Sequence, residues 1–358
     1  MNIVQIFPGK VWGGAEQYVL DLGRALQSRG HTVSYLCRDA SAVTERLRSE
    51  NVSFGIYRRG NVSIPPDTDI IHIHDSSFAG PVVKAAGRDA DRAAVVFTRH
   101  IARASRVLPW RRGAYRRLSA MIFVSGLSET MWRSVNRWMP DEKCVVVHNS
   151  IPPATTSEAA PSLRKKFGIP DTTPLLMFTG RVRRSKGCGV IIEALSRVKE
   201  QYAMVFVGAA KPTDYTSTLQ AMAEKAGIAS SIHFYGFTPD ARSLVAQADI
   251  GLQPSIVREA FGLSQLEFMQ AGKPVITTSN GAQPEYIDSG RTGIIIPEND
   301  PQALAEALGQ LLRSPGERTE IGRAAANYYA EHLSYPTFVD RIINIYNKSL
   351  DQHGNTNG

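Results

Sequence analysis

The sequence predicts an α/β protein with two parallel sheets, and three features of the chain lead to this prediction. Its 358 residues are too many for one ordinary hydrophobic core and suit two. Short β-branched runs alternate with segments of helical periodicity, the pattern of parallel strands covered by helices on both faces. A Pro-, Ser- and Ala-rich stretch at 151–162 interrupts this alternation and is expected to link two domains.

The first half opens with an apolar strand at 3–7, a turn at Gly13-Gly14 and a helix that ends at Gly30. One apolar stripe defines that helix, formed by Ala15, Tyr18, Val19, Leu22 and Leu26. Further buried strands are expected at 32–37, 69–73, 94–98, 121–124 and 144–147.

The second half repeats the alternation with a new set of strands. These are expected near 174–179, 203–208, 232–235, 249–252, 274–277 and 293–296. After Pro301 the pattern is helical to about residue 350, with a break at Pro336. Two tandem Rossmann-like domains are therefore predicted, one at 1–155 and one at 163–333.

Composition and charge limit the classes of function. Hydrophobic residues make up 43% of the chain and charged residues 21%, which is typical of a globular protein. The three cysteines, Cys37, Cys144 and Cys188, form no metal or redox pattern and indicate a reducing compartment. No signal peptide or membrane span is expected, so the predicted location is cytoplasmic. The net charge of +8 favours a negative partner: nucleic acid, an anionic lipid surface or a phosphorylated small molecule.

The strongest cluster of chemically informative residues is REAFGLSQLE at 258–267. Glu259 is expected in the loop after a strand that ends at Leu252, and Glu267 one to two turns into the next helix. The backbone N–H groups from 261 to 264 would then lie at a helix N-terminus, which suits a phosphate or a sugar hydroxyl. Carboxylates eight residues apart are too distant for a glycosidase pair and would hold two parts of one extended ligand. The alternative is a solvated helix face with two incidental acids.

A second cluster, GRVRRSKG at 180–187, follows the strand expected at 174–179. Arg181 offers a bidentate fork for phosphate oxygens, and Lys186 offers a mobile positive charge. Both would stabilise negative charge on a leaving diphosphate. The alternative is a basic surface turn, and the glycine spacing does not fit a Walker loop.

Six motifs in this order resemble the donor domain of glycosyltransferase family 4. They are GRVRRSKG, VGA, IHFYGF, ADIGLQPS, REAFGLSQLEFMQAGKPVI and GAQPEYIDSGRTGIII, spread over about 120 residues. The first half agrees with the family more loosely. The resemblance implies a GT-B fold, with two facing Rossmann-like domains and a C-terminal helix, at about 336–350, that returns to the N-terminal domain.

The resemblance also implies roles for individual residues. It assigns the donor diphosphate to Arg181 and Lys186, and the donor sugar to Glu259. It assigns the ribose hydroxyls to Glu267. Further donor contacts are implied at the base for Gly236 and Phe237, and through the backbone for Phe261, Gly262 and Leu263.

The first half offers fewer candidates. Gly13 and Gly14 would let the backbone approach a phosphate or the acceptor closely, although a tight turn between strand and helix is the alternative. His100 ends the strand in FTRH and resembles the active-site histidine that the family places near the donor sugar. A surface or satisfied histidine is the alternative. His72 and His74 share a strand face, but no third ligand is suggested, so no metal is expected.

These inferences predict a retaining hexosyltransferase that uses a UDP- or GDP-type nucleotide sugar without a cofactor and without a nucleic-acid partner. The expected acceptor is a glycan, a lipid-linked sugar or a lipopolysaccharide or surface polysaccharide. Retention is implied by the family, and a same-face displacement is favoured because no carboxylate nucleophile is evident near His100. The alternatives are a sugar-nucleotide epimerase of the same fold and a non-catalytic module that binds anions or nucleic acid. A phosphorylase-like enzyme would need a Schiff-base lysine, and none is identified.

A basic and aromatic segment at 99–117 bears on the acceptor. Its arginines are Arg99, Arg103, Arg106, Arg111, Arg112, Arg116 and Arg117, with Leu108, Trp110 and Tyr115 between them. Such a segment could lie on the inner face of the cell membrane, bind a phosphorylated sugar or be solvated.

Overall fold

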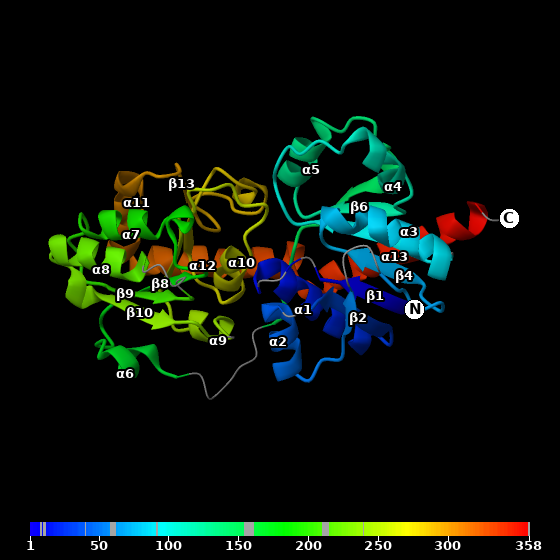
Figure 1. Cartoon of the computed structure of the whole chain (residues 1–358). Helices are drawn as coiled ribbons and strands as arrows, with labels where there is room; N and C mark the ends of the chain where they lie inside the picture. The colour runs from blue at the N-terminus through cyan, green and yellow to red at the C-terminus, as the bar shows by residue number, and fades with distance from the viewer. Residues whose placement is uncertain are drawn as a thin grey trace. The chain divides into compact units, whose positions relative to one another are not determined.

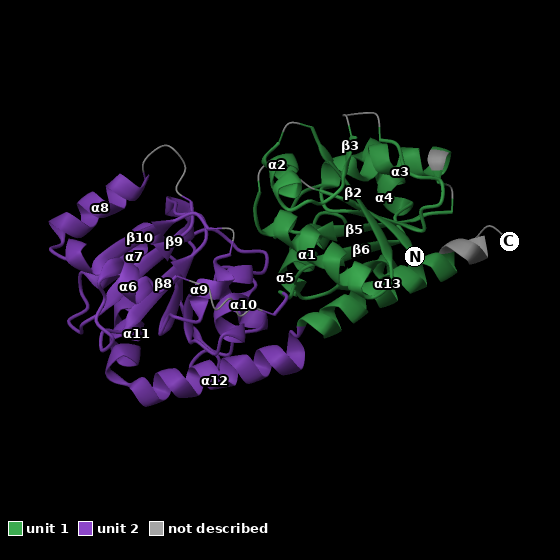
Figure 2. Cartoon of the chain, turned by 90° about the horizontal axis from the view of Figure 1, so that it is seen from below, with its two compact units in different colours: residues 1–151, 335–358 green, residues 152–334 purple. Residues whose placement is uncertain are grey.

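The chain forms two compact units in a computed structural model that describes residues 1–7, 9, 12–39, 41–57, 62–90, 92–153, 161–209, 215–238 and 240–356 (Figure 1). Unit 1 comprises residues 1–151 and 335–358, and unit 2 comprises residues 152–334 (Figure 2). Most of the predicted linker, residues 154–160, lies outside the described residues.

Unit 1 contains a seven-stranded parallel sheet in the order β3-β2-β1-β4-β5-β6-β7. The strands are β1 Asn2–Ile6, β2 Thr32–Arg38, β3 Gly55–Tyr57, β4 Ile70–Ile73, β5 Ala94–Arg99, β6 Ala120–Phe123 and β7 Cys144–Val146. All of them were predicted from the sequence except β3, a three-residue edge strand in which only Tyr57 is buried. So short a run carries no alternating pattern that would reveal it.

The helices of unit 1 include one from the far end of the chain. They are α1 Gly14–Ser28, α2 Ala42–Ser49, α3 Ala79–Asp89, α4 Arg112–Arg116, α5 Gly126–Arg133 and α13 Tyr335–Thr356. The apolar face of α13 packs into the same core as β1 and α1, through Phe338, Val339, Ile342 and Tyr346. Figure 1 shows this red helix beside the blue strands of the N-terminus.

Unit 2 contains a six-stranded parallel sheet in the order β10-β9-β8-β11-β12-β13. Its strands are β8 Leu175–Thr179, β9 Ala203–Val207, β10 Ile232–Gly236, β11 Ile250–Gln253, β12 Val275–Thr278 and β13 Ile294–Ile296. Its helices are α6 Leu163–Phe167, α7 Cys188–Leu195, α8 Tyr215–Lys225, α9 Arg242–Val245, α10 Leu263–Gln270, α11 Pro301–Arg313 and α12 Pro315–His332. The predicted α/β class with two Rossmann-like parallel sheets is confirmed.

Each sheet has one point at which the strand order reverses direction. In unit 1 it lies between β1 and β4, and in unit 2 between β8 and β11. Ligands of open parallel sheets bind at the carboxyl ends of the strands beside such a point. These two edges are therefore where functional side chains are expected. No described helix is both long enough and apolar enough to cross a membrane.

Candidate active site

The edge of unit 2 joins the two clusters that the sequence singled out. Lys186 ends a short 3-10 turn, Arg184–Lys186, after β8, and Glu259 lies in the loop after β11. The Lys186 Nζ is 2.5 Å from the Glu259 Oε1, and the two side chains are 24% and 17% exposed. The hydroxyl of Ser255 donates to the same carboxylate oxygen at 2.8 Å. Two residues 73 positions apart thus form one partly solvated ion pair.

Close backbone packing positions this pair. The N–H groups of Ile256 and Val257 donate to the carbonyl oxygen of Ser185 at 3.0 and 3.2 Å, which joins the loop after β11 to the turn after β8. Gly187 has a φ of +75°, and a Cβ on it would lie 1.8 Å from the carbonyl oxygen of Pro254. Only glycine fits there without displacing backbone.

Glu267 forms a second polar group on the same edge. It lies in the second turn of α10, where its Oε2 accepts from the Thr179 hydroxyl at 3.2 Å and its Oε1 is 3.6 Å from the Arg242 Nε. Burial raises the pKa of Glu267, while Arg242 and Thr179 oppose that shift. Arg242 was not among the residues predicted from the sequence, because it begins the short helix α9 outside all six motifs.

The N-terminus of α10 leaves backbone donors for a ligand. The helix begins at Leu263 after Gly262, whose φ is +103°, and no side chain caps it. Within the described part of the chain, the N–H groups of Gly262, Leu263 and Ser264 find no acceptor. Donors at a helix N-terminus favour an anion.

Phe261 has a structural role that the sequence did not predict. Its ring is 2% exposed and stacks on Tyr286 with centroids 4.6 Å apart. The Tyr286 hydroxyl also donates to the Phe261 carbonyl oxygen at 2.6 Å. The Phe261 side chain is therefore part of the core. The backbone contact with the donor that the resemblance implies stays a prediction.

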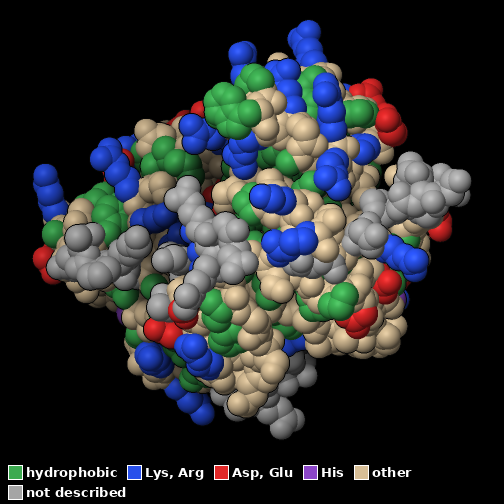
Figure 3. Space-filling model, turned by 45° about the vertical axis from the view of Figure 1, so that its right-hand side comes forward, with side chains coloured by type: hydrophobic (Ala, Val, Ile, Leu, Met, Phe, Trp, Pro, Cys, Tyr) green, Lys and Arg blue, Asp and Glu red, His purple; other side chains and the backbone are tan. Residues whose placement is uncertain are grey.

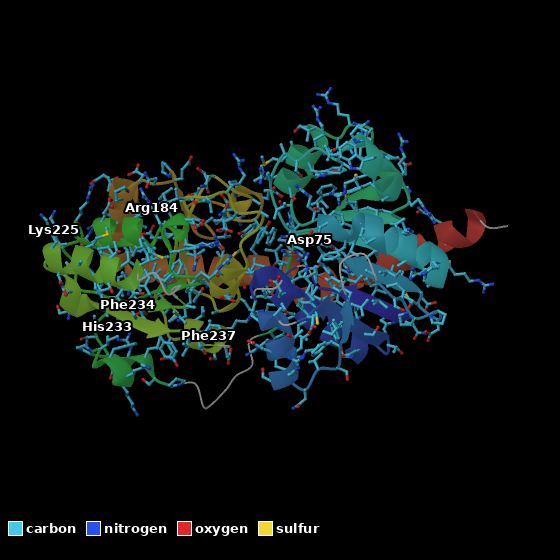
Figure 4. The ribbon with its side chains drawn as sticks, in the orientation of Figure 1. Asp75, Arg184, Lys225, His233, Phe234 and Phe237 are labelled. Atoms are coloured by element: carbon cyan, nitrogen blue, oxygen red, sulfur yellow. The ribbon has the colours of Figure 1, made fainter. Side chains whose placement is uncertain are left out.

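The other predicted donor residues of unit 2 are accessible. Arg181 is exposed and has no ion-pair partner among the described side chains. Gly236 ends β10 with a φ of +88°. Phe237 follows it and is 66% exposed. Figure 4 shows Phe237 beyond Phe234 and His233 at the end of that strand.

His100 directly follows β5 in unit 1 and contacts other aromatic rings. Its Nε2 is 3.1 Å from the Nδ1 of His74, and its ring meets the ring of Tyr18 edge-on with centroids 4.8 Å apart. Burial lowers the pKa of His100 to about 3. Asp75, the carboxylate next to His74, accepts from the Ser77 N–H at 2.7 Å and caps a turn.

The remaining predictions for unit 1 concern glycine and metal. Gly13 caps α1 with a φ of −164°, an extended conformation that any residue adopts, and Gly14 is the first residue of α1. A close approach of this backbone to a ligand stays a prediction. The described residues include no cluster of three or more histidine, cysteine or acidic side chains arranged to hold a metal ion.

The basic segment 99–117 differs in part from the prediction. Arg99 is only 2% exposed, and its Nη2 donates to the Arg103 carbonyl oxygen at 2.7 Å. Arg99 therefore holds the loop from inside and is not a surface charge. Tyr115 is buried as well, whereas Trp110 and Leu108 are 77% and 43% exposed. Figure 3 shows Lys and Arg side chains beside hydrophobic ones at the top of the view, over the region of α4 and α5.

Comparison with known proteins identifies the family. The model of "Glycosyl transferases group 1" matches residues 160–328, and that of "Glycosyltransferase Family 4" matches residues 12–155. A D-inositol 3-phosphate glycosyltransferase of Corynebacterium urealyticum is 29% identical over 200 residues, 53% of this chain and 47% of that protein. The chain thus spans about half the length of the curated relatives it matches.

Solved structures share the fold over nearly the whole chain. A glycosyltransferase from Rickettsia africae ESF-5 superposes with a TM-score of 0.84 at 21% identity, covering 98% of both chains. The Anabaena protein HepE in complex with UDP superposes with a TM-score of 0.81 at 19% identity, covering 96% of this chain and 99% of that one. Since the two family models match one unit each and the neighbours share the GT-B architecture, the chain belongs to glycosyltransferase family 4.

Proposed function

We propose that the chain transfers a hexose from a nucleotide-diphosphate sugar to a hydroxyl acceptor with retention of the anomeric configuration. One observation carries the proposal: the Lys186–Glu259 pair lies on the same strand edge as Glu267 and the uncapped N-terminus of α10. This edge offers cationic groups and backbone donors for a diphosphate, and carboxylates for sugar hydroxyls.

Donor binding would exchange partners within this site. A diphosphate oxygen would accept from Lys186 and from the free N–H groups of α10, with Arg181 adding charge. Glu259 would then be released to accept from a hydroxyl of the donor sugar. The partly solvated state of the pair makes this exchange less costly than breaking a buried one. Glu267 would accept from the ribose hydroxyls, and Phe237 would stack on the base.

The proposed reaction is a same-face displacement. The acceptor oxygen bonds to the anomeric carbon as the bond from that carbon to the diphosphate oxygen breaks. The acceptor proton passes to the leaving diphosphate, whose charge Lys186 and Arg181 stabilise. We propose that these side chains serve in place of a metal ion, and that His100 contacts the donor sugar. A covalent sugar adduct trapped on the wild-type protein would contradict this route.

A donor panel is the direct test. Purified protein is incubated with UDP- and GDP-hexoses and simple acceptors, and release of the nucleotide and the anomeric configuration of the product are measured. We expect turnover with a UDP-sugar, because HepE was solved in complex with UDP, and an axial product from an axial donor. Binding of a nucleotide sugar without transfer or hydrolysis would favour a non-catalytic module.

For the acceptor, we propose a lipid-linked sugar, glycan or lipopolysaccharide met at the inner face of the cell membrane. Exposed Trp110 and Leu108 lie among the exposed arginines of the basic segment, a combination suited to an anionic interface. Co-sedimentation with vesicles of anionic lipid should fall on Trp110→Ala and vanish with neutral lipid. Absence of binding at low salt would instead favour a free phosphorylated sugar as acceptor.

A further inference from the structure

Six polar side chains form a continuous hydrogen-bonded network at the edge of unit 1, and the last member of this network is His100. Each lies on a different part of the fold: Gln5 on β1, His72 on β4, His74 just after β4, Thr98 on β5, His100 just after β5 and Tyr346 on α13. The Thr98 hydroxyl is 2.7 Å from His72 Nε2, and His72 Nδ1 is 2.7 Å from the Tyr346 hydroxyl. The Tyr346 hydroxyl is in turn 3.3 Å from Gln5 Nε2. Gln5 Oε1 is 2.8 Å from His74 Nε2, and His74 Nδ1 is 3.1 Å from His100 Nε2.

The side chains of this network carry no charge. Gln5, His72, Thr98 and Tyr346 are 0% exposed and His74 is 4% exposed. Burial lowers the pKa of His72 and His100 to about 3 and that of His74 well below its usual value, and it raises the pKa of Tyr346. Each imidazole is therefore neutral at physiological pH and carries one hydrogen, on either Nδ1 or Nε2.

The amide of Gln5 determines which atom donates and which accepts in each hydrogen bond of this network. Its Nε2 can only donate, so Tyr346 accepts from it and turns its own hydrogen toward His72. Its Oε1 can only accept, so His74 must carry its hydrogen on Nε2. The Nδ1 of His74 then has a lone pair and accepts from His100, which places the hydrogen of His100 on Nε2.

We propose that Gln5, Tyr346 and His74 are positioning residues that hold His100 in the Nε2–H tautomer, so that its Nδ1 offers a lone pair to a hydroxyl of the donor sugar. The Nδ1 of His100 has no hydrogen-bond partner within the described part of the chain. The role assigned to that lone pair rests on the proposed function, whereas the tautomer itself does not. If the Gln5 amide were rotated, every hydrogen bond would reverse and His100 would offer an N–H group instead.

The tautomer is measured directly by nitrogen-15 NMR of histidine-labelled full-length protein, with the His100 signals assigned by their loss in His100→Gln. We expect the wild-type protein to show one His100 tautomer, with hydrogen on Nε2. Tyr346→Phe removes the acceptor that orients Gln5, so both tautomers should appear. Gln5→Leu leaves the His74 Nε2 against an apolar group, so its hydrogen should move to Nδ1 and His100 should become mainly Nδ1–H.

Tyr35→Phe is the matched control for the loss of a buried hydroxyl. Tyr35 is 3% exposed in the same unit, and its hydroxyl has no hydrogen-bond partner among the described atoms. This variant should keep the wild-type His100 tautomer. The proposal is overturned if wild-type His100 carries its hydrogen on Nδ1, or if Tyr346→Phe and Gln5→Leu both fold and keep the single Nε2–H form.

Turnover supplies the second readout. Because only one tautomer is competent, kcat should fall in proportion to the fraction of Nε2–H lost, about twofold when the two forms are equally populated. The affinity for UDP should not change, since UDP lacks the sugar hydroxyl that His100 is proposed to contact and the proposed nucleotide contacts belong to unit 2. If kcat did not change with the fraction of the Nε2–H tautomer across the variants, the role of the lone pair would be overturned. No turnover in any form, with the expected NMR result, would overturn the proposed function alone.

Discussion

The two strand edges have the same topology and opposite chemistry. In unit 2 the edge carries the pairs Lys186–Glu259 and Arg242–Glu267, whose side chains are 15–24% exposed. In unit 1 the corresponding edge carries histidine, glutamine, threonine and tyrosine side chains that are at most 4% exposed apart from His100. The same strand order thus positions side chains without fixing their chemistry. A charged, partly wet edge suits a diphosphate, and a neutral, dry one suits the orientation of a single imidazole.

Lys186→Ala should break the charged edge with the largest effect. It removes a cation that we propose stabilises the leaving diphosphate, so kcat should fall by about 10²- to 10³-fold. The fold should persist, because the side chain is partly exposed. Arg184→Ala, an exposed charge in the same turn, is the matched control and should retain activity. If both variants behaved alike, the charge of Lys186 would matter only through the general field of the turn.

Gly187→Ala should show that the charged edge depends on close backbone packing. Its Cβ would lie 1.8 Å from the Pro254 carbonyl oxygen, so we expect the free energy of unfolding to fall by about 3 kcal/mol or more. Gly227→Ala is the control, because Gly227 has a φ of +72° with no atom within 4 Å of an added Cβ. It should cost about 1 kcal/mol in urea unfolding. Equal losses would mean that the loops separate easily.

Glu267→Gln should sharpen the comparison, because burial raises the pKa of this carboxyl in the folded protein. The unfolded carboxyl keeps the ordinary pKa of glutamate, so the folded state binds the proton more tightly. That stabilisation is present below the unfolded pKa and is lost as the pH rises through the folded pKa. As the pH rises from acidic to neutral, the free energy of unfolding of the variant should therefore increase relative to that of the wild type.

The same substitution should weaken UDP binding by about tenfold, since a hydrogen bond to a charged acceptor is stronger than one to an amide. Calorimetric titration with UDP and thermal unfolding across pH measure the two effects. Glu193→Gln, on an exposed face of α7, should change neither. Stability of the Glu267 variant that falls relative to wild type as pH rises would contradict the shift.

Phe237→Ala should have the smallest effect. The ring is 66% exposed, so stability should change by less than about 0.5 kcal/mol. Loss of stacking on the base should raise the donor KM about fivefold, equivalent to about 1 kcal/mol, with kcat unchanged. Ile56→Ala, an exposed apolar residue on β3, should leave the donor KM as it is. An unchanged KM in Phe237→Ala would show that the base binds elsewhere.

Sequence revealed most of the fold because the buried strands are short, mainly apolar runs bounded by turns. It missed β3, whose Gly55 and Ile56 are exposed. It located Lys186 and Glu259 separately, but the pairing depends on β8 and β11 being neighbours, a property of sheet order. The proposed roles of these residues in catalysis remain predictions.

The neutral edge of unit 1 was harder to foresee. The alternation of His72 and His74 predicts a shared strand face, and their rings are indeed 4.1 Å apart. Their partners, however, come from β1, β5 and α13, and Tyr346 is 274 residues from His72. Arg99 was counted as a surface charge for a related reason: composition shows that a segment is basic but not which arginine points inward.

The position of Tyr346 on α13 has a consequence for how the protein is made. A ribosome synthesises all of unit 2 before it reaches this residue. Until then, the apolar surface of unit 1 that packs against Phe338, Val339 and Ile342 is left uncovered by α13. At that stage Gln5 keeps His74 and His72 keeps Thr98 as a hydrogen-bond partner, but both lack the Tyr346 hydroxyl that joins them. The half that begins first is therefore completed last, and translation stopped after unit 2 leaves His100 without the helix that orients it.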